Sequence, residues 1–70
     1  MKCTILHETR GRMRVHTMQG AMSLQQADIL EAYLNRVSGV TKATVYDRTG
    51  DAVICHDGPR ETLTKALSSF

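Results

Sequence analysis

The chain has 70 residues, enough for one domain, and a domain of this size buries only about 60% of its unfolded surface, so its core is small. A net charge of +2 is too weak by itself to indicate nucleic-acid binding, and no stretch approaches the roughly 20 apolar residues of a membrane span. Two cysteines are too few for a disulfide framework, and the first residues contain no apolar signal core, which favours free thiols in a reducing compartment.

The first 17 residues predict extended structure in two pieces. Residues 3–7 are a short β-prone run, and residues 12–17 alternate, with Met13 and Val15 pointing to one side. The other side of that strand is basic, with Arg12, Arg14 and His16. Gly11 marks either a bulge within one continuous strand or a turn between two strands.

Residues 20–40 have the pattern of an amphipathic helix followed by the start of a strand. Ser23 and Gln26 predict a capping box, in which the hydroxyl accepts a backbone N–H and the amide reaches back. One apolar stripe recurs at helical spacing, Ala27, Leu30, Leu34 and Val37, and is widened on one flank by Ile29 and Tyr33. Gly39 is expected to end the helix in the left-handed conformation, and Val40 to open the strand.

The rest of the chain predicts a β-hairpin and a second helix. Residues 40–46 form a strand, residues 48–51 a tight turn with Gly50 available for positive φ, and residues 52–56 the partner strand. On the first of these strands Ala43 and Val45 point inward, and Thr44 and Tyr46 point outward. The helix is expected to take Pro59 as its first residue. Its buried stripe comprises Leu63, Ala66, Leu67 and Phe70.

The order β-α-β-β-α indicates an α+β two-layer sandwich, and the ferredoxin-like split βαβ arrangement fits best. Its usual last strand is absent, so we expect residues 3–7 to be ordered as a strand that fills the vacant edge. They either fold back at residues 9–11 to pair with residues 12–16, or run straight on through a bulge at Gly11. The straight form leaves an edge for a second molecule and predicts a homodimer. The alternation of side chains slightly favours the straight form. A bulge would reverse the side of the sheet that each side chain faces, so both forms stay open.

The landmarks Gly20, Gly39-Val40 and Thr49-Gly50 have the spacing of the heavy-metal-associated domain, and the chain resembles that family over residues 12–70. The run Gly-Arg-Met-Arg-Val at 11–15, preceded by His7, looks still more like a divergent branch. That branch occurs at the N-terminus of bacterial metal-transporting P-type ATPases and generally lacks the metal-binding cysteine pair.

The family's two cysteines would fall at Ser23 and Gln26. A neutral hydroxyl and an amide cannot replace two thiolates, so we expect no high-affinity metal site in this loop. The weaker metal candidates are soft or imidazole side chains on the predicted sheet, namely Cys3, His16 and Cys55.

The resemblance implies that residues 1–70 are a regulatory or docking domain from a longer ATPase, on the cytoplasmic face of the bacterial plasma membrane, soluble as a fragment and not itself catalytic. The parent would use ATP, Mg²⁺ and a transported heavy-metal ion, whereas this domain would hold no cofactor. Its partners would be other domains of the parent, or a second copy at a sheet edge. The expected interaction face comprises Arg12, Arg14, His16, Tyr46 and Cys55.

The alternative is a free-standing ferredoxin-like binding protein for RNA or a protein partner. An open sheet with arginines can bind RNA when exposed aromatics stack on the bases, but Tyr46 is the one aromatic expected on this sheet. The sequence also contains no Ser/His/Asp arrangement and no glycine-rich phosphate loop, so we predict no catalytic residue.

Overall fold

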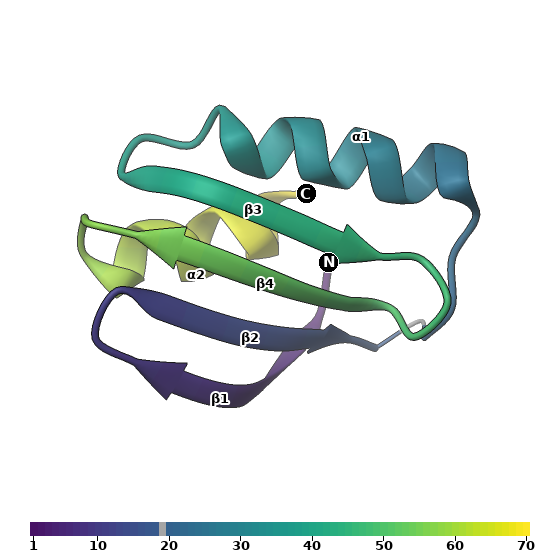
Figure 1. Cartoon of the computed structure of the whole chain (residues 1–70), viewed down its shortest axis with the longest axis horizontal. Coiled ribbons are helices and arrows are strands. Elements are labelled where there is room, and N and C mark those ends of the chain that lie inside the picture. Colours follow the sequence, from purple (N-terminus) through teal and green to yellow (C-terminus); the bar gives the residue numbers. More distant parts are fainter. Residues whose placement is uncertain (19) are drawn as a thin grey trace.

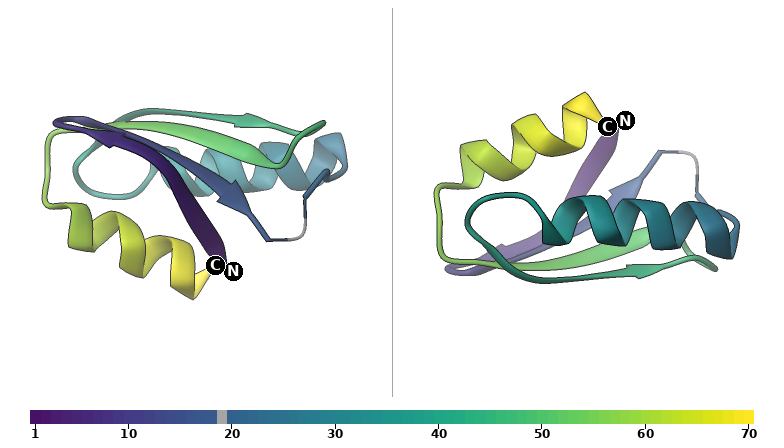
Figure 2. Two further views of the ribbon diagram at one scale, coloured as in Figure 1. Left: turned by 90° about the horizontal axis from the view of Figure 1, so that it is seen from below. Right: turned by 90° about the horizontal axis from the view of Figure 1, so that it is seen from above.

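The computed structural model describes residues 1–18 and 20–70. Its elements follow in the order β1 (Cys3–Thr9), β2 (Arg12–Thr17), α1 (Leu24–Asn35), β3 (Val40–Tyr46), β4 (Asp51–His56) and α2 (Arg60–Ser69) (Figure 1). The strands form one antiparallel sheet in the order β1-β2-β4-β3. Both helices lie on the same face of that sheet, as the two views of Figure 2 show, which makes a two-layer α/β sandwich.

Residues 3–7 are ordered as a strand, as predicted, and β1 extends to Thr9. It turns back at Gly11, whose φ is +89°, and pairs with β2, so the continuous strand favoured by alternation is wrong. The alternation of side chains gave the wrong answer because the β1–β2 register shifts between Ile5 and His7. This bulge leaves Ile5 opposite the inward Val15 and His7 opposite the outward Arg14, although Ile5 and His7 are two residues apart.

Helix α1 begins where the capping box predicted and ends earlier than expected. The Ser23 hydroxyl accepts the backbone N–H of Gln26 at 3.1 Å, which confirms the first half of the box. The helix stops at Asn35, so the prediction that Gly39 ends it is wrong. Gly39, with φ +90°, instead lies in the turn before β3, where a Cβ would sit 3.2 Å from the Cα of Gly58.

The second half of the chain follows the prediction with small shifts at two boundaries. Strand β3 has the predicted bounds, and β4 begins at Asp51, one residue before the predicted start. Pro59 is the N-cap of α2 and not its first residue, because its ψ of 141° is extended. Gly50 has φ +78° in the β3–β4 turn, and any side chain there would collide with the backbone carbonyl of Gly20.

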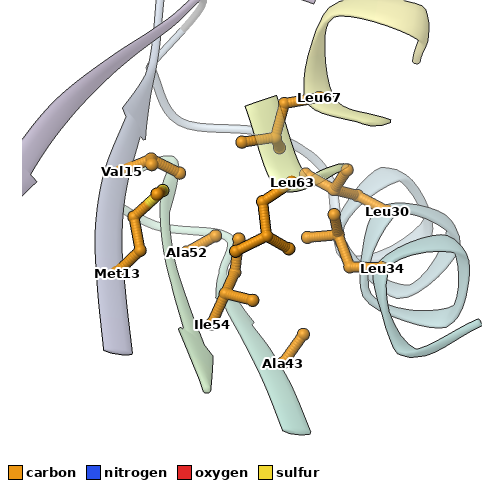
Figure 3. Packing of buried hydrophobic residues seen from close by; sticks show 9 residues of the cluster. All are labelled: Met13, Val15, Leu30, Leu34, Ala43, Ala52, Ile54, Leu63 and Leu67. Carbon is orange, nitrogen blue, oxygen red and sulfur yellow. The ribbon is translucent and has the colours of Figure 1, made fainter. Parts of the chain in front are cut away.

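The core lies between the sheet and the helices, and side chains from both helices point toward the strands (Figure 3). Its buried cluster comprises Met13, Val15, Leu30, Leu34, Ala43, Ala52, Ile54, Leu63 and Leu67. The α1 stripe is confirmed at Ala27, Leu30 and Leu34, whereas its predicted fourth member, Val37, lies beyond the end of the helix and is only partly buried. No helix in the described part of the chain is long and apolar enough to cross a membrane.

The flank residues of the two helical stripes behave differently from one another. Ile29 is 53% exposed, so its predicted place in the widened stripe is wrong, because the buried face of α1 is limited to the row of Ala27, Leu30 and Leu34. Tyr33 packs against the core, and its hydroxyl donates to the carbonyl of Ala66 at 2.8 Å. The Tyr33 ring also lies 4.9 Å from that of Phe70, which is 41% exposed and not buried as predicted.

The β3 edge of the sheet is sealed by polar side chains of α1. The Asn35 side chain accepts the N–H of Ala43 at 3.0 Å and donates to its carbonyl at 3.2 Å. One helical turn earlier, a carboxylate oxygen of Glu31 accepts the N–H of Val45 at 2.9 Å. Backbone groups that would face open solvent at a sheet edge are therefore bonded within the molecule.

The β1 edge is held in a different way. Arg60 at the start of α2 donates to the Glu8 carboxylate at 2.7 Å, and the amino group of Met1 lies 3.3 Å from the carbonyl of Ser68. These contacts fix the two ends of β1, while Ile5 and Leu6 between them are 40% and 52% exposed. Within the described residues, no side chain bonds the outward backbone of β1 as Asn35 and Glu31 do for β3.

Candidate functional site

The outer face is the side of the sheet turned away from the helices, and the strand register arranges its residues in rows. These rows run from β1 to β3 as Thr4, His16, Asp51 and Tyr46, then His7, Arg14, Val53 and Thr44, then Thr9, Arg12, Cys55 and Lys42. The structure therefore brings together on one surface all the residues predicted as an interaction face, namely Arg12, Arg14, His16, Tyr46 and Cys55.

A carboxylate organises the first two rows. Asp51, whose side chain is 10% exposed, accepts a hydrogen bond from Arg14 at 2.9 Å on one oxygen, and its other oxygen lies 2.7 Å from Nδ1 of His16. The hydrogen bond from Arg14, and then the one with His16, hold the pKa of Asp51 below its ordinary value. Asp51 is thus ionised at neutral pH and fixes the direction of the Arg14 side chain.

Sequence reasoning assigned Asp51 to the turn and missed this role. The signal was present in Gly50, because a glycine with positive φ closes the turn and makes the next residue the first of the returning strand. His16, which contacts Asp51, is 35 residues away from it in the sequence. This contact depends on the β2–β4 register, which no local pattern specifies.

The third row is positively charged, and none of the three rows supplies a carboxylate to neutralise it. Arg12 and Lys42 both lie beside Cys55 in the register, one on each neighbouring strand. Within the three rows, all of them described, Asp51 is the one acidic residue, and its two oxygens are engaged by Arg14 and His16. The outer face is therefore electropositive and suited to a partner with negative charge.

Two hollows indent the outer face, and Tyr46 lines both. The first, of about 310 Å³, lies at the β3–β4 turn and is lined by Arg14, Tyr46, Asp47, Arg48 and Thr49. The second, of about 230 Å³, lies over the third row and is lined by Arg12, Lys42, Thr44, Tyr46, Val53 and Cys55. Arginine and tyrosine are the side chains that most often dominate binding at protein interfaces.

The candidate metal ligands are not gathered at one place. Cys3 pairs with the buried Thr17 at the inner side of β1, and burial raises the pKa of its thiol. His16 and Cys55 lie on the outer face but in the first and third rows. Among the described residues, no three His, Cys, Asp or Glu side chains form a group that could hold a metal ion.

Ser23 and Gln26, the two positions at which the resemblance would place metal-binding cysteines, lie at the start of α1. The Ser23 hydroxyl is the N-cap acceptor for the backbone N–H of Gln26. This arrangement is a helix cap, and the groups in it are a neutral hydroxyl and a backbone amide, which are poor ligands for soft metal ions.

Compared with known proteins, the chain matches no protein-family model and no curated protein at a significant level.

Proposed function

We propose that the chain is a docking domain of a bacterial metal-transporting P-type ATPase, of the divergent heavy-metal-associated type that lacks the cysteine pair. It contacts the parent's other soluble domains at the cytoplasmic face of the membrane through its outer face. The observation that carries the proposal is the electropositive outer face, open to solvent and held in shape by Asp51.

The order of the elements supports a ferredoxin-like assignment. The segment β2-α1-β3-β4-α2 has the order of a split βαβ unit with a second helix, and its strands are arranged β2-β4-β3. Strand β1 lies beside β2, the position that the final strand takes in that fold. We infer that the N-terminal hairpin supplies the strand at this position.

The start of α1 supports a role in docking over a role in metal delivery. Ser23 is used as a helix cap, so the segment that would carry metal in the resembled family has a structural task here. In this proposal the parent supplies ATP, Mg²⁺ and the metal ion, and the domain supplies a binding surface.

Binding of the parent's other soluble domains to the isotopically labelled domain tests the proposal. We expect amide NMR shifts concentrated on the outer face, and at least about tenfold weaker binding for Arg12→Glu combined with Lys42→Glu. Lys65→Glu, on the exposed side of α2, is the matched control and should bind as the wild type does. Shifts confined to the helices, or binding indifferent to the charge reversal, would overturn the proposal.

Titration with Cu(I) or Zn²⁺ against a competing chelator tests the part of the proposal that concerns metal. We expect no stoichiometric tight site, because no thiolate pair is present at the start of α1. A tight one-to-one complex that is lost in Ser23→Ala would contradict it.

An RNA-binding role is the second candidate, because Arg12, Arg14 and Lys42 would also attract phosphates. Tyr46 is the one aromatic residue in the three rows, which limits base stacking. Tight binding of poly(U) in 150 mM salt, together with no binding of the parent's domains, would favour this candidate.

A further inference from the structure

The hollow at the β3–β4 turn, here called the turn pocket, has the size and lining of a site for one large side chain. Arg14, Tyr46, Asp47, Arg48 and Thr49 line its volume of about 310 Å³. Its lining is mostly apolar, and the half-exposed Tyr46 is the one aromatic residue in it. An aromatic side chain would bury apolar surface on both partners in such a hollow.

The turn pocket is held in shape before any partner arrives. The N–H of Met22 donates to the carbonyl of Asp47 at 2.8 Å, and the N–H of Thr17 donates to the carbonyl of Gly50 at 2.8 Å. The turn is therefore bonded to both ends of the loop that leads from β2 to α1. A preformed site loses less conformational entropy on binding, which increases affinity.

The rim of the turn pocket carries two guanidinium groups with donors to spare, beside the single carboxylate of Asp47. Arg14 gives one N–H group to Asp51, and its side chain is still 48% exposed, so other donors of the guanidinium face solvent. Arg48, which also lines the hollow, is exposed. Two guanidinium groups beside an apolar hollow suit an aromatic ring, by cation–π contact, and carboxylates next to it.

We propose that the turn pocket binds an aromatic side chain flanked by acidic residues, presented by a protein partner. This inference rests on the proposed docking function and names the chemistry of the partner. A protein segment is favoured over a nucleic acid because the pocket offers a single anchor, lined by one aromatic residue, whereas single-stranded nucleic acids need several stacking positions along a basic groove.

A set of end-blocked peptides tests the inference on the full chain. The probe peptide has a central phenylalanine with two glutamates on each side, and its two controls replace the phenylalanine by alanine or the glutamates by glutamines. We expect the probe to shift the amide resonances of Tyr46, Arg48 and Thr49. Each control peptide should bind at least about tenfold more weakly.

Protein variants then assign the site. Arg48→Glu lies in an exposed turn and should still fold, and Tyr46→Ala removes the aromatic ring from the lining. Each of these two variants should bind the probe peptide about tenfold more weakly. Lys65→Glu should bind it as the wild type does. Equal binding of the alanine peptide, shifts away from the turn, or displacement of the probe by poly(U) at lower concentration would overturn the inference.

Failure here differs from failure of the docking proposal. If the parent's domains bind and respond to Arg12→Glu with Lys42→Glu but not to Tyr46→Ala or Arg48→Glu, docking stands and the turn pocket is not its anchor. If they respond to none of these variants, the docking function itself fails.

Discussion

At the β3 edge, helix α1 reaches over the sheet and occupies the backbone groups of Ala43 and Val45 with the side chains of Asn35 and Glu31. At the β1 edge, helix α2 contacts the strand near its two ends, through Arg60–Glu8 and through Ser68 with the amino terminus. Each edge has backbone groups that could pair with another chain, and the two edges differ in how those groups are covered. The backbone of the first edge is bonded to side chains of α1, whereas the second edge is contacted near its ends and has a bulge between Ile5 and His7.

The difference predicts an uneven distribution of stability. The α1 half of the core contains the fully buried Leu30 and Leu34, whereas β1 exposes Ile5 and Leu6. Regions with few buried apolar groups open at a lower free energy than the global unfolding of the domain. We therefore expect the β1 hairpin to open first. The homodimer predicted from the sequence would have to use the β1 edge, and it stays a prediction.

Deletion of residues 1–9 is expected to have the largest effect on the difference between the two edges. The deletion removes β1 and exposes the β2 ladder together with its buried residues Met13 and Val15. We expect loss of cooperative unfolding, or self-association, measured by thermal melts and sedimentation. A shortened domain that stays monomeric and equally stable would show that β1 protects nothing.

Truncating two apolar side chains of α1 and one of β1, each in a separate variant, sharpens the comparison. Leu30→Ala should destabilise by about 2–5 kcal/mol, as should Leu34→Ala, because each leaves a cavity in a fully buried site. Ile5→Ala, at a 40% exposed position, should cost less than about 1 kcal/mol. Urea unfolding measures all three variants, and equal losses would contradict the uneven distribution.

Asn35→Ala tests the hydrogen bonds between the side chain of Asn35 and the backbone of β3. It removes two hydrogen bonds to Ala43 and should destabilise by about 1 kcal/mol, with faster hydrogen exchange at the Ala43 amide. Asn35→Asp keeps the acceptor for that amide and serves as the control. Unchanged exchange in Asn35→Ala would mean that the strand needs no cover there.

The acid titration of Asp51 tests a contact in the middle of the sheet, because Asp51 bridges the two central strands, β2 and β4. Its pKa is lowered in the folded protein, so its stabilisation is present above the unfolded value of about 3.9 and is lost as the pH falls through the lower folded value. Asp51→Asn should flatten the pH dependence of unfolding in this acidic window. An unaltered profile would show that the carboxylate contributes nothing there.

The smallest effect is expected from Arg60→Gln, which removes the exposed contact with Glu8. Exposed ion pairs contribute little to global stability, so the melting temperature should hardly change. Hydrogen exchange in β1 should nevertheless rise at low salt, and the difference from wild type should disappear in 0.5 M salt. A large change in melting temperature would mean that this contact supports more than the edge.

The elements that could be predicted from the sequence are those specified by local patterns. The buried stripe of α1 and the bounds of β3 depend on periodicities of 3.6 and 2 residues, which are visible in any short window. The hairpin at Gly11 was not resolved from the continuous strand, because that choice depends on a bulge near Leu6 and on pairing with β2.

The candidate site was predicted in part for the same reason. Alternation along β2 identified Arg12, Arg14 and His16 as one face, and the structure keeps them there. The bond from Arg14 to Asp51 joins residues 37 apart, and the turn pocket combines β2 with the β3–β4 turn, so neither appears in a local pattern.

The closeness of Met1 to Ser68 has a topological consequence. The two ends of the chain lie side by side on the helix side of the sheet, as both views of Figure 2 show. Paired ends are what an inserted domain needs, because a host loop can be opened at one peptide bond and joined to both without being stretched. A host attached in this way would be joined on the helix side, so the two linkers would leave the outer face uncovered.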